Sequence, residues 1–265
     1  MSSAILIADC GSTSCEWRLI EQEKISALPA TRGFNPTYEP AENLKAELDL
    51  FEEFSEIKDR VKSIYYYGAG CTSRLSQNKV HAALGEKFTH AEIEVKSDLW
   101  AAARAVFQGQ PLICGILGTG SNACRFDGNN LEFAVPSLGY ILGDEGSGNH
   151  IGRLLLNAYF YGEMPIELQE SFADQFEIEL DVVLKNTYRQ GNASGYLANF
   201  AVFAGDRQQD PFIRYLVASS MRAYLTHFVK GFAECNELQL FLVGSVAHYF
   251  REIIAEESTA LSINL

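Results

Sequence analysis

The chain has 265 residues, of which 47% are hydrophobic and 21% are charged, a balance typical of a globular protein with a buried core. Its net charge of −13 argues against nucleic acid or an anionic membrane surface as a partner. A small phosphorylated ligand is compatible with this charge, because backbone amides bind phosphate without a positive side chain. No apolar run has the roughly 18 residues of a membrane span, and the first residues, MSSAILIADC, lack a basic leader, so we expect a cytoplasmic protein.

The first half of the chain predicts three strands followed by alternating helices and strands. Apolar and polar residues alternate, with tight turns between the runs, in three segments at 3–9, 14–20 and 23–28. Helical spacing of apolar residues follows, and then buried strand patterns alternate with helical ones. The later elements are a helix at 41–57, a strand at 63–70, a helix at 74–87, a strand at 91–95 and a helix at 98–107.

The second half repeats this order. Three strands are predicted at 111–117, 122–127 and 131–135, then a mainly helical segment, then a strand at 238–245 and a helix at 247–257. The repetition indicates an internal duplication, with one domain at 1–108 and a second at 109–265. The second domain would carry a helical insertion at about 147–234. No linker separates the halves, so we expect them to pack closely around a cleft.

The cysteines and histidines do not form a metal or disulfide pattern. The six cysteines are scattered and include no C-x-x-C pair, and the five histidines show no helix-spaced pair. This distribution predicts buried, reduced thiols of the kind found in intracellular proteins. His150 is expected to be an orienting or solvated side chain and not a metal ligand.

Two Gly-Ser turns carry the clearest sequence signal. LIADCGSTSC (6–15) and GILGTGSNAC (115–124) superpose with Gly11 on Gly120 and Ser12 on Ser121. Glycine lacks the Cβ that would keep a ligand from the backbone, and successive N–H groups in such a turn bind anions. Two equivalent turns in duplicated domains therefore predict that both hold the phosphates of one nucleotide. Asp9, at the end of the first strand, is a candidate ligand of Mg²⁺, through water.

Three motifs resemble those of the sugar kinase/actin/Hsp70 superfamily. Asp9–Thr13, Leu117–Asn122 and Val243–Ala247 are similar to its phosphate-1, phosphate-2 and adenosine motifs. The stretches GFNP, SDLWAAARA and LGYILGDEGSG resemble the N-acetylglucosamine kinase branch of the BadF/BadG/BcrA/BcrD-type ATPase family. The resemblance implies an α/β fold of two duplicated ribonuclease-H-like (actin-like ATPase) domains with a central cleft. It also implies ATP and Mg²⁺ as cofactors. The nucleotide-binding residues that it implies are Gly11, Ser12, Thr13, Gly118, Thr119, Gly120, Ser121, Asn122, Gly244 and Ser245.

The same resemblance assigns roles at the sugar. It makes Asp98 the general base that accepts the proton of the sugar 6-hydroxyl, and the predicted helix N-terminus there is expected to keep its carboxylate ionised. It places Asp144 on the sugar with Glu145 close by, since carboxylates suit vicinal hydroxyls. Asn35 would contact the sugar as well. Gly139 would line the amino-sugar pocket, although Ser137-Leu138 replace the aromatic-Gly arrangement that relatives have before it.

These assignments predict an ATP-dependent amino-sugar kinase that phosphorylates N-acetylglucosamine at O6. Its partner would be a small sugar, and a homodimer is compatible with the sequence. Three alternatives remain open at this stage. The substrate could be N-acetylmuramate or glucosamine, the chain could be a BadF-type ATPase coupled to a partner protein through an iron–sulfur cluster, or it could be a non-catalytic sugar sensor on the same fold.

Overall fold

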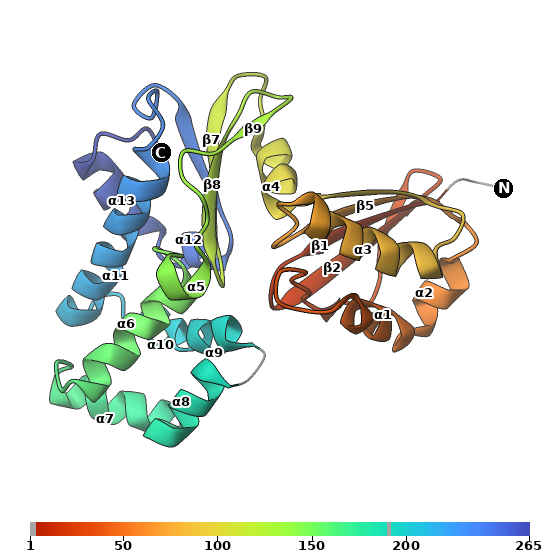
Figure 1. The fold of residues 1–265 in the computed structure, drawn as a ribbon. Coiled ribbons are helices and arrows are strands. Elements are labelled where there is room, and N and C mark those ends of the chain that lie inside the picture. The colour runs from red at the N-terminus through yellow and green to blue at the C-terminus, as the bar shows by residue number, and fades with distance from the viewer. Residues whose placement is uncertain (1–3, 190–191) are drawn as a thin grey trace. The chain divides into compact units, whose positions relative to one another are not determined.

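The computed structural model describes residues 4–189 and 192–265. The chain divides into two compact units (Figure 1): unit 1 ends at Ala101, and unit 2 runs from Ala102 to Leu265. The division falls inside helix α4 (Asp98–Val106), between the last strand of unit 1 and the first strand of unit 2. Residue 3, with which the first predicted strand began, lies outside the described residues.

Unit 1 contains a mixed sheet of six strands in the order β3-β2-β1-β5-β6, with β4 paired to β2. β1 runs antiparallel to β2 and parallel to β5, and β5 runs parallel to β6. Because β1, β5 and β6 are parallel, their carboxyl ends meet at one edge, where Cys10, Gly68 and Ser97 lie in register. The strands are β1 (Ala4–Cys10), β2 (Ser14–Glu21), β3 (Lys24–Ala27), β4 (Thr31–Arg32), β5 (Val61–Gly68) and β6 (Glu92–Ser97).

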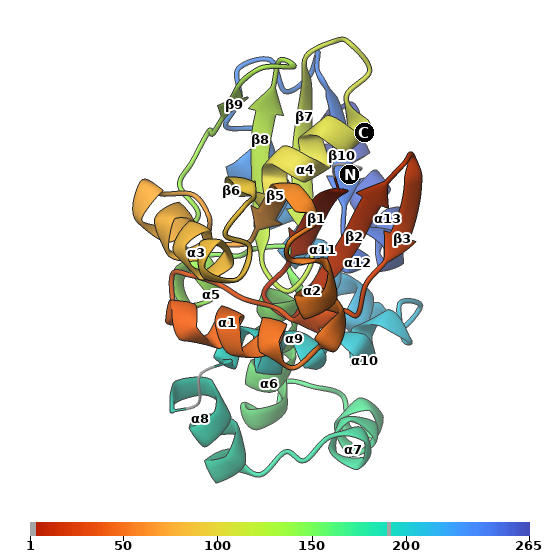
Figure 2. The same ribbon diagram turned by 90° about the vertical axis from the view of Figure 1, so that its right-hand side faces the viewer.

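The helices of unit 1 pack against this sheet and complete its core (Figure 2). They are α1 (Ala41–Asp49), α2 (Glu52–Ile57) and α3 (Arg74–Lys87). The single helix predicted at 41–57 was wrong, because the backbone is extended at Phe51 and separates α1 from α2. The break turns the second helix so that Phe54 and Ile57 enter the same core as Leu44 and Leu48. Ser73 caps the N-terminus of α3, because its side chain accepts a hydrogen bond from the Ser76 backbone N–H.

Unit 2 contains a four-stranded sheet in the order β10-β7-β8-β9. β7 runs antiparallel to β8 and parallel to β10, and β8 runs antiparallel to β9. The order β9-β8-β7-β10 therefore matches β3-β2-β1-β5 of unit 1 in position and in direction. The strands are β7 (Leu112–Leu117), β8 (Ser121–Phe126), β9 (Leu131–Glu132) and β10 (Gln239–Val243).

The segment predicted to be helical contains a series of helices that bury one large core with the second sheet. Ser147 caps the N-terminus of α6, because its Oγ accepts a hydrogen bond from the His150 N–H. The helix predicted at 247–257 is two helices, separated at the buried Phe250. The helices of unit 2 are α5 (Gly139–Leu142), α6 (Gly148–Phe160), α7 (Ile166–Gln175), α8 (Leu180–Tyr188), α9 (Ala193–Asn199), α10 (Ala201–Gly205), α11 (Pro211–Tyr224), the π-helical η1 (Leu225–Val229), α12 (Ser245–Tyr249) and α13 (Arg251–Ala260).

Two further features bear on the sequence-based expectations. All six cysteines are buried and none forms a disulfide. Across residues 4–189 and 192–265, every helix is too short or too polar to cross a bilayer.

The contact between α6 and α9 depends on glycine. A Cβ atom at Gly152 would lie 1.9 Å from the Leu197 carbonyl oxygen, whereas one at Gly85 in α3 would meet only the Ile93 Cδ1 atom, at 3.8 Å. We expect Gly152→Ala to lower the free energy of unfolding by roughly 1–3 kcal/mol, because one backbone must move away from the other. The matched helix-interior change Gly85→Ala is expected to raise it by about 0.5–1 kcal/mol. Urea denaturation measures both, and equal effects would contradict the packing described here.

Candidate functional site

In unit 1 the predicted phosphate turn is held by a loop from further along the chain. The Gly11 N–H donates to the Ser14 carbonyl at 2.9 Å and closes the β1–β2 hairpin, and the Gly33 N–H donates to the Thr13 carbonyl at 2.9 Å. A Cβ atom at Gly33 would lie 2.4 Å from the Gly11 carbonyl oxygen, so only glycine fits beneath this turn. Sequence reasoning missed Gly33, and its place two residues before Asn35 was the only available signal.

Asn35 lies on the same loop. Its Oδ1 accepts a hydrogen bond from the Thr37 N–H at 3.0 Å. A Cβ atom at Gly70 would lie 2.0 Å from that oxygen, which places the loop against the end of β5. Asn35 therefore has a local structural role, as Asn often does in turns, besides the predicted sugar contact.

At the carboxyl edge of the sheet in unit 1, two carboxyl groups, Asp9 and Asp98, have raised pKa values. Asp9 lies opposite Glu16 in the β1–β2 register. Desolvation raises the pKa of Asp9, and the charge of Glu16 raises it further. Asp98, which follows β6, is partly accessible, and its Oδ1 accepts a hydrogen bond from the Leu99 N–H at 3.0 Å.

The pKa of Asp98 departs from the expectation for a helix N-terminus. Hydrogen bonds from the Leu99 N–H and from its own N–H favour the ionised carboxylate. Desolvation outweighs them and, together with the negative charge of Asp9, raises the pKa of Asp98 to about 6. Such a carboxyl is mostly ionised at pH 7 and takes up a proton readily.

The acidic groups of unit 1 also decide what kind of metal site would fit. Among the described residues, no three His, Cys, Asp or Glu side chains gather as metal ligands. Mg²⁺ usually keeps several waters and binds one or two carboxylates together with substrate phosphates. Asp9 is exposed at a strand end beside other negative charges, so it suits a shared site of this type and not an all-protein cage.

In unit 2 the second phosphate turn is attached to the start of α6. The Gly148 N–H donates to the Gly118 carbonyl at 2.8 Å, and the Asn149 N–H donates to the Thr119 carbonyl at 3.1 Å. Within the turn, the Gly118 N–H donates to the Gly120 carbonyl at 3.0 Å. The predicted nucleotide turn and the helix that follows the acidic loop are therefore one hydrogen-bonded structure.

Asp144 lies directly behind this turn and is buried, with 6% of its surface exposed. A Cβ atom at Gly120 would lie 2.9 Å from its Oδ2, so the turn approaches the carboxylate closely because it contains glycine. Asp144 has a backbone φ of 58°, a left-handed conformation that is uncommon outside glycine. Desolvation is the largest effect on the pKa of Asp144 and raises it, while hydrogen bonds from Asn149 and the Ser121 N–H act in the opposite direction.

The rest of the acidic loop is fixed by side chains from two directions. The Ser121 Oγ donates to the Glu145 carbonyl at 2.7 Å, and the Gly146 N–H donates to the Ser220 Oγ at 3.1 Å. The Ser220 Oγ is also 2.7 Å from His150 Nδ1. Desolvation lowers the pKa of His150 to about 4, so this ring is neutral at pH 7 and its Nδ1 shares one hydrogen bond with the Ser220 hydroxyl. His150 is therefore linked through Ser220 to the backbone of the acidic loop.

The predicted amino-sugar residue Gly139 begins the short helix α5. Its φ of 72° is a conformation that glycine adopts without strain. Arg153 of α6 donates to the carbonyls of Tyr140 and Ile141 at 2.8 Å and holds α5 in place. Leu138, one of the residues that depart from the family pattern, is 56% exposed just ahead of Gly139.

Gly244 joins the predicted adenosine motif to the second phosphate turn. Its φ is 110°, and a Cβ atom there would lie 2.3 Å from the Leu117 carbonyl oxygen. Only glycine allows β10 to end this close to the turn. Ser245 then begins α12.

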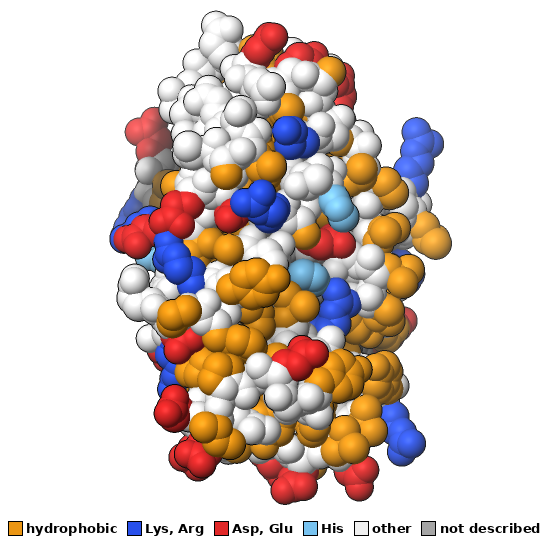
Figure 3. All heavy atoms as spheres, turned by 90° about the vertical axis from the view of Figure 1, so that its left-hand side faces the viewer, with side chains coloured by type: hydrophobic (Ala, Val, Ile, Leu, Met, Phe, Trp, Pro, Cys, Tyr) orange, Lys and Arg blue, Asp and Glu red, His pale blue; other side chains and the backbone are white. Residues whose placement is uncertain are grey.

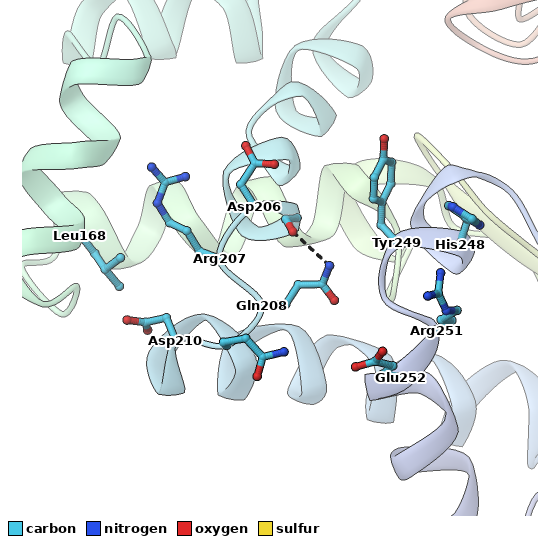
Figure 4. Close-up of a pocket in the computed structure, with 11 residues that line it drawn as sticks. Leu168, Asp206, Arg207, Gln208, Asp210, His248, Tyr249, Arg251 and Glu252 are labelled. Carbon is cyan, nitrogen blue, oxygen red and sulfur yellow. Dashed lines mark hydrogen bonds between the residues drawn. The ribbon is translucent and has the colours of Figure 1, made fainter.

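A cavity of about 780 Å³ opens beside α12 in unit 2. It lies between the loop after α10 and the start of α13, and side chains of both positive and negative charge line it (Figure 4). Figure 3 shows the face of unit 2 with α7, α11 and α13, on which charged and hydrophobic side chains border one another. The lining residues are Leu168, Gly205, Asp206, Arg207, Gln208, Gln209, Asp210, His248, Tyr249, Arg251 and Glu252. Sequence reasoning missed this cavity, because its walls come from segments that show no shared motif.

The structure brings the predicted site residues together in two sets, one in each unit. In unit 1, the carboxyl edge of the sheet carries Asp9, Gly11, Ser12, Thr13, Asn35 and Asp98. In unit 2, the second turn and the loops attached to it carry Gly118, Thr119, Gly120, Ser121, Asn122, Gly139, Asp144, Glu145, Gly244 and Ser245. Each set combines a Gly-Ser turn with acidic side chains.

Comparisons with known proteins give relatives among the solved structures. The chain is 32% identical to a "putative N-acetylglucosamine kinase" from Porphyromonas gingivalis, over 98% of this chain and 93% of that one, with a TM-score of 0.89. A protein from Chromobacterium violaceum with the same description is 18% identical, over 95% of this chain and 90% of that one, with a TM-score of 0.69. A ROK family glucokinase from Streptomyces griseus, solved with glucose and AMPPNP, is 16% identical over 99% and 90% of the two chains, with a TM-score of 0.58. The last two show the fold alone. No protein-family model matches the chain, and no curated protein matches it in sequence.

The raised pKa of Asp98 can be measured directly. In protein labelled with ¹³C at aspartate carboxyl carbons, we expect one resonance to titrate near pH 6 and to disappear in Asp98→Asn. Asp9→Asn should lower the pKa of Asp98, because it removes a neighbouring negative charge. A resonance of Asp98 that titrates at the ordinary value near 4 would contradict the desolvation described here.

Proposed function

Because the chain belongs to the N-acetylglucosamine kinase family, we propose that it transfers the γ-phosphoryl group of ATP to the 6-hydroxyl of N-acetylglucosamine. The relationship to a family member extends over nearly the whole length of both chains, which supports an ATP-dependent sugar kinase. One observation of the site carries the choice of mechanism: a desolvated carboxyl group, Asp98, lies beside Asp9 at the carboxyl edge of the first sheet.

Asp98 is proposed as the general base. Phosphoryl transfer has a loose transition state, so the acceptor hydroxyl needs a positioned group more than a strong base. A carboxylate with a pKa of about 6 is ionised at neutral pH and can still accept the hydroxyl proton as the new P–O bond forms. The proton then resides on an Asp98 oxygen, where desolvation favours the neutral form.

The nucleotide phosphates are proposed to bind at the two Gly-Ser turns. Gly11–Thr13 of unit 1 and Gly118–Asn122 of unit 2 can each present backbone N–H groups and hydroxyls to an anion. Asp9 would hold Mg²⁺ through water, and the ion would neutralise charge on the transferring phosphoryl group. ATP as the donor is in keeping with the Streptomyces griseus glucokinase, which shares the fold and was solved with AMPPNP.

The cavity beside α12 is proposed to take the adenosine end of the nucleotide. α12 begins at Ser245, immediately after Gly244, which abuts the second phosphate turn. The cavity starts one helical turn further on, at His248 and Tyr249. Tyr249 offers an exposed ring for stacking on a base, and carboxylates such as Glu252 can accept hydrogen bonds from ribose hydroxyls.

The sugar is proposed to bind at Asp144, with Glu145, Asn35 and Gly139 completing its surroundings. A buried carboxylate that is ionised can accept hydrogen bonds from two vicinal hydroxyls. The halves 1–108 and 109–265 are proposed to be copies of one ribonuclease-H-like domain, which the equal order and direction of their strands support.

The structure keeps one alternative to this proposal and disfavours another. Ser137-Leu138 before Gly139 depart from the family pattern, and the exposure of Leu138 keeps another amino sugar, such as N-acetylmuramate or glucosamine, as the second candidate. A partner-coupled ATPase with a shared iron–sulfur cluster is disfavoured. All six cysteines are buried, so none is available at a surface to ligate such a cluster.

The proposal predicts sugar-dependent release of ADP from Mg·ATP. We expect N-acetylglucosamine to stimulate release more than glucose, glucosamine or N-acetylmuramate does, and Asp98→Asn to reduce the sugar-dependent rate by roughly 10²–10⁴-fold. The control is Asp127→Asn, which changes an exposed aspartate on the β8–β9 turn and should keep wild-type rates.

In the same assay, Tyr249→Ala should raise KM for ATP and leave KM for the sugar unchanged.

Release that does not depend on any sugar would contradict the kinase proposal and favour the partner-coupled ATPase. Stimulation by N-acetylmuramate or glucosamine alone would keep the kinase and replace its substrate. No release under any condition would favour the non-catalytic sensor.

A further inference from the structure

Asn149, which sequence reasoning did not single out, is one of the most deeply buried polar residues of unit 2. It lies in the first turn of α6 with 1% of its surface exposed. Its Nδ2 donates to Asp144 Oδ2 at 2.7 Å and to the Ser194 Oγ at 3.1 Å. Both protons of this amide are therefore engaged, one by the proposed sugar residue and one by the helical segment.

The orientation of the Asn149 amide is fixed by chemistry. An ionised carboxylate can only accept hydrogen bonds, so the Asn149 Nδ2 and not its Oδ1 must face Asp144. As a result, Oδ1 is buried and has no hydrogen-bond partner among the described residues. Burying an acceptor without a partner costs free energy. The hydrogen bonds that hold this side chain in place are therefore those of its Nδ2, of which the shorter is donated to Asp144.

Asp144 needs this support. It is 6% exposed, and this burial raises the cost of keeping an ionised carboxylate there. Its left-handed backbone conformation adds strain to the same residue. The groups facing it that carry charge are Glu145, which disfavours ionisation, and Arg153, which favours it. The hydrogen bonds from the Ser121 N–H and the Asn149 Nδ2 favour the ionised form.

Ser194 is held against Asn149 by the packing of α9 on α6. Gly148 and Gly152 lie four residues apart on α6 and face α9. A Cβ atom at Gly148 would lie 3.2 Å from the Ala198 Cβ, and one at Gly152 would lie 1.9 Å from the Leu197 carbonyl oxygen. The two helices are therefore in backbone contact, which leaves Ser194 little freedom to move away from Asn149.

We propose that Asn149 is a positioning residue that orients the Asp144 carboxylate for the sugar hydroxyls, and that Ser194 of α9 orients Asn149 in turn. The helical segment thereby takes part in sugar recognition without touching the sugar. The inference rests on the proposed function, because it presupposes that Asp144 binds the substrate.

Removing the Asn149 amide should affect both the orientation and the pKa of the Asp144 carboxyl group. Without the Asn149 donor, Asp144 is less well oriented, and its ionised form loses a stabilising hydrogen bond. The pKa of Asp144 then rises, so sugar binding is lost at a higher pH on the acid side. Phosphoryl transfer from the bound state depends on Asp98 of unit 1 and should change less.

The first experiment compares the sugar kinetics of three variants at saturating Mg·ATP. We expect Asn149→Ala to raise KM for the sugar roughly tenfold with a smaller effect on kcat, in line with the loss of a hydrogen bond to a charged group. The acid limb of kcat/KM should move to higher pH. Asn149→Asp, which keeps the size but adds a second carboxylate, should have a larger effect in the same direction. The matched control, Asn130→Ala, removes an amide–carboxylate hydrogen bond to Asp127 in an exposed turn and should leave KM and the pH profile unchanged.

A double-mutant cycle separates positioning from general structural damage. In an Asp144→Asn background, Asn149→Ala should weaken sugar binding by a much smaller factor than it does in the wild type, because its target carboxylate is gone. Ser194→Ala, at a partly exposed position that should tolerate the change, is expected to reproduce the KM effect in weaker form. Equal effects of Asn149→Ala in both backgrounds, or an unchanged KM in a folded variant, would overturn the positioning role. Failure of the proposed function is distinguishable, because the wild-type protein itself would then show no sugar-dependent ADP release.

Discussion

The hydrogen bonds between the Gly118–Ser121 turn and the N-terminus of α6 are the constraint on which the site of unit 2 depends. Gly148 and Asn149 donate their backbone N–H groups to the carbonyls of Gly118 and Thr119. The same two helix residues continue into the site, since the Asn149 side chain holds Asp144 and Gly148 packs on α9. The phosphate turn, the acidic loop and the helical segment therefore form one rigid arrangement, and a change in any of them displaces the others.

In unit 1, parallel strands bring residues from distant parts of the chain to one edge of the sheet. Because β1, β5 and β6 end at the same edge, Asp9 and Asp98 lie near each other although they are far apart in the sequence. Desolvation raises the pKa of both groups, and the negative charge of Asp9 raises the pKa of Asp98 further. Carboxyl groups with pKa values raised in this way gather at functional sites, where a group that can take up a proton near neutral pH is useful.

The local patterns of the sequence were sufficient for most of the strands, the two Gly-Ser turns and the start of the helical segment near 147, since each depends on residues close together in the chain. They missed the two-residue β4 (Thr31–Arg32), and the strand predicted at 131–135 is limited to β9 (Leu131–Glu132). The breaks at Phe51 and Phe250 were not predictable, because the apolar spacing continues through both and only packing in the core decides where the helix ends. Gly33, Asn149 and the cavity beside α12 also escaped prediction. Each acts through contacts between segments far apart in the sequence, for which a single amino-acid sequence gives no signal.

Identification of the reaction product tests the central claim most directly. After incubation of the protein with Mg·ATP and N-acetylglucosamine, ³¹P NMR distinguishes a phosphate on the primary 6-hydroxyl, which couples to two protons, from one on a ring hydroxyl, which couples to one. The account predicts a single new phosphomonoester signal with coupling to the two C6 protons. A phosphate on a ring hydroxyl, or ADP and inorganic phosphate with no phosphomonoester of the sugar, would contradict it.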